Sequence, residues 1–199
     1  MTLLLLLLSF FSIVITFLIP FKYIKLIKNV SLLFSIVIFS LTLFLTLTFD
    51  KTTGHFQQAY HFIWSDYLNI YYSVGVDGFS IFFILLTTFL IPFCILYSWN
   101  QFIYAIKELL LLLLTIEFLL LNFFLVTDLI FFFIFFESIL IPMFLLIGCF
   151  GSRQRRIHAS FQFFLFTMTG SFFMLLAFFI VYIHEGSTDF LVFYYANFS

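Results

Sequence analysis

The chain has 199 residues, of which 65% are hydrophobic and only 9% are charged, and its mean hydropathy is +1.26. Soluble domains are about half apolar and about a quarter charged, so this composition excludes a water-soluble globule, and it equally excludes a disordered chain. The net charge of −1 leaves no basic surface for nucleic acid, and two cysteines give neither a disulfide framework nor a metal-ligand spacing. A polytopic helical membrane protein remains, because lipid offers backbone groups no hydrogen-bond partner.

Six apolar stretches approach the length of about 20 residues that a membrane-spanning helix needs. In chain order they are 2–20, 29–49, 78–98, 108–127, 129–149 and 157–183. We therefore expect an all-α membrane protein with six transmembrane helices in a single transmembrane domain. The first stretch has no preceding basic residue and no following cleavage site of small residues, so it is predicted to remain as a span. The longest polar connection, 50–77, holds aromatic residues and is expected to lie at the membrane interface.

Basic residues predict the orientation of the six spans. Three loops on one side, 21–28, 99–107 and 150–156, hold seven of the eight Lys and Arg residues, namely Lys22, Lys25, Lys28, Lys107, Arg153, Arg155 and Arg156. The positive-inside rule places these loops in the cytoplasm or the mitochondrial matrix, with both chain termini on the opposite side. The three arginines are first a topology signal, and binding to anionic lipid or to a partner loop is a second interpretation.

Two carboxylates, Glu117 and Glu137, fall near the middle of predicted spans, where an ionisable group is costly and marks a candidate functional site. The two spans are joined only by Thr127–Asp128, so they form an antiparallel hairpin, and Asp128 is most simply the N-cap of 129–149. At 1.5 Å per residue, Glu117 lies roughly 16 Å and Glu137 roughly 13 Å below that turn. The two carboxylates are therefore expected at similar depth, although spacing does not reveal whether they face each other.

Glu137 is predicted to lie in dry surroundings, because its neighbours three and four residues away are Phe133, Ile134, Leu140 and Ile141. Burial of this kind disfavours a charged carboxylate. Pro142 lacks a backbone donor and clashes with the carbonyl of Ser138, so it is expected to distort the helix near Glu137 and free a carbonyl for water. The competing interpretation is a neutral, hydrogen-bonded residue that fixes helix packing.

Three segments resemble the chain 4 family of mitochondrial NADH:ubiquinone oxidoreductase, the antiporter-like membrane subunits of respiratory complex I. They are Gly-Val-Asp-Gly-Phe-Ser-Ile at 75–81, Phe-Phe-Glu-Ser-Ile-Leu-Ile-Pro-Met at 135–143, and Gly-Ser-Arg-Gln-Arg-Arg-Ile at 151–157. The resemblance is strong over about 75–190 and rests on hydropathy alone over 1–74. It places the fifth-helix glutamate of the family on Glu137 and the fourth-helix glutamate on Glu117.

The resemblance implies the N-terminal part of an antiporter-like fold, in a subunit that moves protons across the mitochondrial inner membrane while NADH reduces ubiquinone elsewhere in the complex. It implies no cofactor in this chain, with NADH, FMN, iron–sulfur clusters and ubiquinone in the whole assembly. The implied partners are other membrane-arm subunits and membrane lipids. The three basic loops would then face the matrix and both termini the intermembrane space.

The chain also departs from that family, whose members have about fourteen helices in two inverted repeats. It has six predicted spans, none with a Lys or Arg inside, so the seventh-helix lysine that pairs with the fifth-helix glutamate is missing. A truncated copy and a split subunit both fit, and we expect a second chain to carry the C-terminal part with the Lys partner of Glu137. A stand-alone ion-coupled transporter and a structural or assembly subunit without transport are the alternatives.

Overall fold

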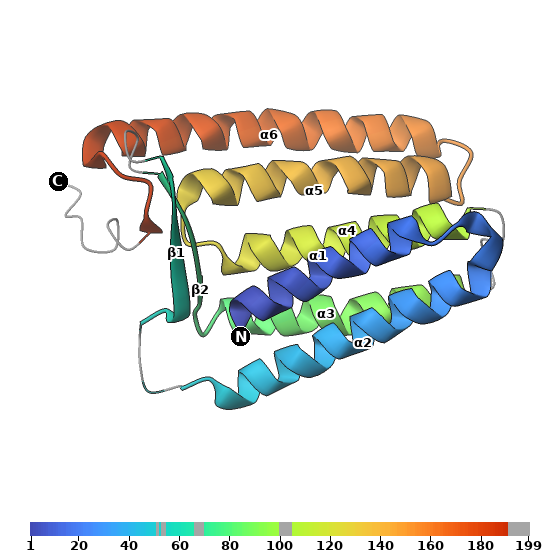
Figure 1. Ribbon diagram of the computed structural model, residues 1–199. Coiled ribbons are helices and arrows are strands. Elements are labelled where there is room, and N and C mark those ends of the chain that lie inside the picture. The colour runs from blue at the N-terminus through green and yellow to red at the C-terminus, as the bar shows by residue number, and fades with distance from the viewer. Residues whose placement is uncertain (51, 53–54, 66–69, 100–104, 191–199) are drawn as a thin grey trace.

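The computed structural model describes residues 1–199 apart from 51, 53–54, 66–69, 100–104 and 191–199, and six long helices dominate it (Figure 1). They are α1 Thr2–Leu18, α2 Ile24–Thr48, α3 Ser80–Ser98, α4 Ile106–Leu125, α5 Leu129–Phe150 and α6 Arg156–Glu185, and a short 3₁₀ turn, η1 Phe21–Tyr23, precedes α2. Each predicted stretch falls on one helix. Five helices are long and apolar enough to cross a membrane, whereas α1 has 17 residues, or about 26 Å of helix.

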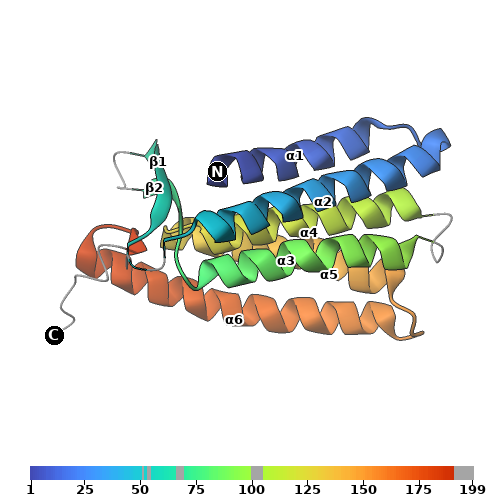
Figure 2. The ribbon, with the colours of Figure 1, turned by 90° about the horizontal axis from the view of Figure 1, so that it is seen from below.

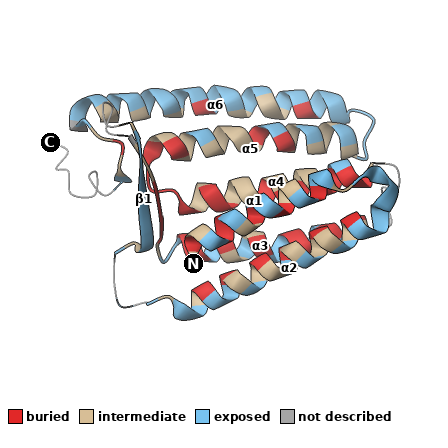
Figure 3. Cartoon of the chain, viewed as in Figure 1, coloured by how far each residue is buried: buried red, intermediate tan, exposed pale blue. Residues whose placement is uncertain are grey.

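The first four helices form a closed bundle, and the last two extend from it. Helices α1 to α4 pack in a ring, in the order α1, α2, α3, α4 and back to α1, and α2 also contacts α4 across it. Helix α5 packs mainly on α4 and α6, and α6 packs on α5 (Figures 1 and 2). Along α6 most side chains are exposed (Figure 3). The chain therefore consists of a four-helix core and a two-helix extension that is covered on one side.

The core contains two hydrophobic clusters, one toward each end of the bundle. The first surrounds Leu6, Ile38, Ile84 and Leu121, and the second surrounds Ile27, Ile91 and Leu114, with Ile13 packed against it. Each cluster takes side chains from α2, α3 and α4, so the same helices are held together at both ends. Between the two clusters lies a middle level of the bundle.

The connection 50–77, which was expected to lie at the membrane interface, contains regular structure that the sequence analysis did not predict. It contains an antiparallel two-stranded hairpin, β1 Gln57–Ser65 and β2 Ile70–Val76, in which Gln57 pairs with Val76 and Ser65 with Ile70. The hairpin stands across one end of the bundle, on the side of the N-terminus (Figure 1). Strand β2 is buried from Ser73 to Val76, whereas β1 is largely exposed, so one strand packs on the helices and covers their ends.

Candidate functional site

Glu117 is fully buried in the middle of α4, with no exposed surface. Along α4 it lies between Leu114 of one hydrophobic cluster and Leu121 of the other, and so at the middle level of the bundle. Neither Oε1 nor Oε2 has a hydrogen-bond partner among the residues that the structure describes. A buried carboxylate without a partner is rare in native proteins. Burial of an unpaired neutral polar group already costs ~2–7 kcal/mol, and burial of a charged carboxylate costs more. Such a group therefore needs a bound proton, a water molecule or a cation.

Small hydroxyl-bearing residues occupy the same level of the neighbouring helices. On α1, Ser9 and Ser12 lie between residues of the two clusters, as do Ser35 on α2 and Thr88 on α3, and all four are fully buried. Their hydroxyls donate to carbonyls of their own helices, for example Ser12 Oγ to the Ser9 carbonyl at 2.6 Å. The middle of the bundle is therefore a polar layer, which the helical spacing of small polar residues could have indicated and which the sequence analysis missed.

Glu137 is only half-buried on α5, and its Oε2 is buried with no hydrogen-bond partner in the described part of the chain. Of the apolar neighbours expected around it, Leu140 is buried, whereas Ile134 is 45% and Ile141 61% exposed on the open side of the two-helix extension. The surroundings are apolar as predicted, but within this chain they are incomplete. Glu117 is therefore the more deeply enclosed of the two carboxylates.

The other predicted residues fall near the ends of α5. Pro142 is buried and lies inside α5 without ending it, so the helix runs unbroken past Glu137 to Phe150. Arg153 and Arg155 are exposed in the connection to α6. Arg156 begins α6 and donates from Nη1 to the carbonyl of Gly151 at 3.0 Å.

Lys107 is not a loop residue but lies in the first turn of α4, where it is buried. Its Nζ donates to the carbonyls of Phe17 and Ile19 at 2.8 and 2.7 Å, and it lies 4.4 Å from the centre of the Phe21 ring. The last carbonyls of a helix lack intrahelical partners and carry partial negative charge, so this cation completes the C-terminus of α1.

Asp128 is the N-cap of α5, as predicted, and it also joins two other segments. It accepts from the amides of Ile130 and Phe131 at 2.9 and 3.2 Å, and from the hydroxyl of Thr188 beyond α6. The preceding residue, Thr127, donates through its hydroxyl to Ser73 of β2 at 2.7 Å. This turn therefore holds the hairpin, the start of α5 and the segment after α6 together.

A second polar link joins the hairpin to α4, one turn beyond Glu117. Tyr72 donates its hydroxyl to Asn122 Oδ1 at 2.7 Å, and Asn122 Nδ2 donates to the carbonyl of Phe118 at 2.8 Å. Burial raises the pKa of Tyr72 to about 12, so its hydroxyl remains a donor. No local sequence signal pairs these two residues, since 50 positions separate them.

The fold is a helical membrane bundle with a buried carboxylate in mid-span, and residues 126–196 match the family described as NADH:quinone oxidoreductase/Mrp antiporter, transmembrane. The chain is 47% identical over 182 residues to NADH-ubiquinone oxidoreductase chain 4 of Chondrus crispus and 45% identical over 188 residues to that of Arabidopsis thaliana. It is thus homologous to chain 4 over 92% and 94% of its own length, and it spans only 37% and 38% of theirs.

A solved structure shares the fold. A chain of respiratory complex I from Thermus thermophilus with bound NADH matches 96% of this chain with a TM-score of 0.79 and 29% sequence identity, over 38% of that chain. The predicted fold class and the predicted resemblance are therefore confirmed.

Proposed function

We propose that this chain is the N-terminal part of a proton-translocating membrane-arm subunit of respiratory complex I, in the mitochondrial inner membrane. Similarity to chain 4 supports membership of complex I. The observation that supports a role in proton movement is the buried Glu117 carboxylate in the polar layer, which has no hydrogen-bond partner among the described residues. In this proposal NADH, FMN, iron–sulfur clusters and ubiquinone are held by other subunits. The chain supplies no redox step and holds protons at Glu117 and Glu137.

In this proposal, Glu117 binds and releases a proton in a dry site. As a carboxylate it has no donor from the described residues, and as a carboxylic acid it still lacks an acceptor, so neither state is fixed by a hydrogen bond. A group of this kind changes its protonation whenever a water or a nearby charge arrives. On α5, which packs against α4, Glu137 Oε2 is likewise buried and lacks a hydrogen-bond partner among the described residues.

Substitution by glutamine tests this role in the intact complex. We expect Glu117→Gln to assemble normally and to lower the number of protons pumped per NADH oxidised, because an amide keeps the shape of the acid but cannot release a proton. Glu137→Gln should do the same. Glu108→Gln is the matched control, since Glu108 is an exposed carboxylate at the start of the same helix.

Two outcomes contradict the proposal. Full pumping by an assembled Glu117→Gln complex removes Glu117 from the proton route. A loss of assembly with unchanged pumping per NADH in the remaining complex assigns it to packing instead.

We also propose that a basic partner of Glu137 comes from polypeptide outside residues 1–199, packed on the open side of α5 and α6. The exposed residues of these helices include Ile134, Ile141, Phe161, Phe172 and Phe179. The expectation that this polypeptide is a separate chain remains a prediction. Photocrosslinking from position 134 in the native membrane complex, followed by identification of the joined peptide, tests it, and crosslinks to lipid alone contradict it.

The orientation remains a prediction of the same kind. We propose that η1 and the 151–155 connection face the matrix, with the hairpin and both termini in the intermembrane space. A membrane-impermeant thiol reagent added from the matrix side should label a cysteine placed at Arg155. If the reagent labels this cysteine only from the intermembrane-space side, the proposed topology is reversed.

A further inference from the structure

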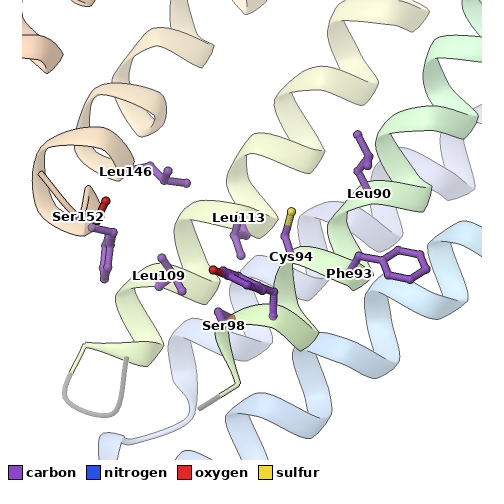
Figure 4. A pocket seen from close by; sticks show the side chains of 10 residues that line it. Leu90, Phe93, Cys94, Ser98, Leu109, Leu113, Leu146 and Ser152 are labelled. Atoms are coloured by element: carbon purple, nitrogen blue, oxygen red, sulfur yellow. The ribbon is translucent and has the colours of Figure 1, made fainter. Parts of the chain in front are cut away.

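A groove that takes no part in the carboxylate site lies between α3, α4 and the end of α5, at the end of the bundle opposite the hairpin (Figure 4). We call it the α3–α5 groove, and Leu90, Cys94, Ser98, Leu113, Leu146 and Ser152 define it. Its volume is about 510 Å³ and its walls are mostly apolar. The outer wall opens sideways, because Phe93 is 55% and Tyr97 72% exposed. A lateral opening of this kind admits a ligand from the bilayer.

The length and width of the groove suit an acyl chain. Leu90 and Ser98 lie eight residues apart on α3, which is about 12 Å along the helix axis. One leaflet contributes about half of the ~30 Å hydrocarbon core, so the groove runs through most of a leaflet. A helix ~10 Å across and equally long would need roughly 900 Å³, which exceeds the available volume. The occupant is therefore narrower than a transmembrane helix.

The head of the groove carries positive charge. Ser152 lies both in its wall and in the connection that bears Arg153 and Arg155, which are exposed. Arg156 is folded back by its hydrogen bond to the Gly151 carbonyl, next to Ser152. Guanidinium groups bind phosphate with paired hydrogen bonds, and a basic cluster beside an apolar cleft at the membrane surface matches an anionic headgroup joined to an acyl chain.

We propose that the α3–α5 groove binds an anionic phospholipid of the leaflet on the arginine side. One acyl chain lies along α3 and α4, and the phosphate is held at the 151–156 connection. A neutral lipid would leave the three guanidinium groups without a counter-charge. A soluble ligand would not use an apolar wall that is open toward the bilayer.

The two cysteines provide a direct readout. Cys94 lines the groove, whereas Cys149 is exposed on α5 outside it, and neither forms a disulfide. The membrane complex that contains this chain is reconstituted in phosphatidylcholine vesicles with or without phosphatidylglycerol and alkylated with N-ethylmaleimide, and both peptides are quantified by mass spectrometry. We expect phosphatidylglycerol to slow alkylation of Cys94 and to leave Cys149 unchanged.

Substitutions test the charge. Arg153→Gln and Arg155→Gln should each lower the preference for phosphatidylglycerol by about fivefold, since one basic residue near an anionic surface contributes that factor. Arg153→Lys should retain most of the preference. Lys22→Gln is the control. It also removes one positive charge, but Lys22 lies in the exposed turn η1 and does not line the groove.

Three results overturn the proposal. The first is equal alkylation of Cys94 in both kinds of vesicle. The second is protection that survives both Arg→Gln substitutions or is lost equally in Lys22→Gln. The third is a Cys94 that stays unreactive in neutral vesicles as well, which identifies a protein segment as the occupant. The comparison of wild type between vesicles is decisive even if a variant fails to assemble.

Discussion

Individual buried polar residues carry most of the specific information in this fold. The buried apolar positions are filled mainly by Leu and Ile, whereas Glu117, Asp128, Lys107 and Asn122 are buried polar residues that each lie in a different environment. The sequence identified Glu117 and Glu137 by their depth, and it identified Asp128 by its place before a span. It could not show that Glu117 points into a closed bundle while Glu137 lies at an open side, because depth along a helix does not specify direction around it.

Asp128 is expected to make stability depend on pH. Burial raises the pKa of its carboxyl above the ordinary 3.8, and the bonds from Thr188, Phe131 and Ile130 oppose that rise. The folded protein then binds more protons than the unfolded one between pH 3.8 and the raised pKa, so the free energy of unfolding falls as pH rises through that window. Asp128→Asn keeps the cap oxygen and removes the titration.

The measurement is the thermal unfolding midpoint of the purified complex, compared between wild type and Asp128→Asn from below pH 3.8 upward. The wild type should lose stability relative to the variant as pH rises. A difference that stays constant with pH contradicts the assignment.

Lys107→Met is predicted to destabilise the junction of α1 with α4. The substitution keeps most of the side-chain volume but leaves the carbonyls of Phe17 and Ile19 without their donor. Hydrogen bonds to a charged group contribute about 1.5–3 kcal/mol each, so a loss of about that size is expected in a denaturant titration. Lys22→Met, at an exposed lysine in the η1 turn that follows α1, should change the midpoint little.

At the scale of elements, hydropathy predicted where helices lie better than where they begin. The predicted stretch 29–49 corresponds to α2 Ile24–Thr48, which starts five residues earlier. Lys25 and Lys28 are good helix formers but poor lipid neighbours, so hydropathy excludes them while the helical backbone includes them. The β1–β2 hairpin was missed for a different reason, since its stability depends on pairing and on packing against α4, which are non-local.

Close packing of α5 on α6 depends on Gly148. A methyl group added there would lie 3.2 Å from Ser160 Oγ, tighter than ordinary contact. We expect Gly148→Ala to lower the stability of the α5–α6 pair and the double variant Gly148→Ala, Ser160→Ala to recover part of it. Small residues allow such approaches between membrane helices.

Gly170→Ala is the matched control, because nothing lies within 4 Å of the added methyl group in this chain. Alanine is favoured over glycine in a helix by up to ~1 kcal/mol, so this variant should be neutral or slightly stabilised. If Gly170→Ala lowers the stability of the assembled complex, a partner polypeptide packs against that face of α6. Equal effects of the two alanines would remove the special role of Gly148.

At the scale of the whole molecule, the four-helix core and the two-helix extension should differ in local stability. Among the described residues, α1 to α4 each pack against at least two other helices, whereas α6 packs mainly on α5. Local opening requires least free energy where few contacts are lost. Amide hydrogen exchange of this chain in lipid nanodiscs should therefore be faster in α6 than in α3, and the difference should shrink in the assembled complex. Uniform exchange across the six helices contradicts this division.

The division into core and extension has a consequence for biogenesis. The ribosome delivers α1 to α4 first, and these helices close on one another and enclose Glu117 before α5 and α6 follow. In this chain the half-buried Glu137 then lies on a helix pair whose outer side carries exposed apolar residues such as Ile134 and Ile141. That outer side stays in contact with lipid until another polypeptide packs on α5 and α6, so the helices made last are also the last to be covered.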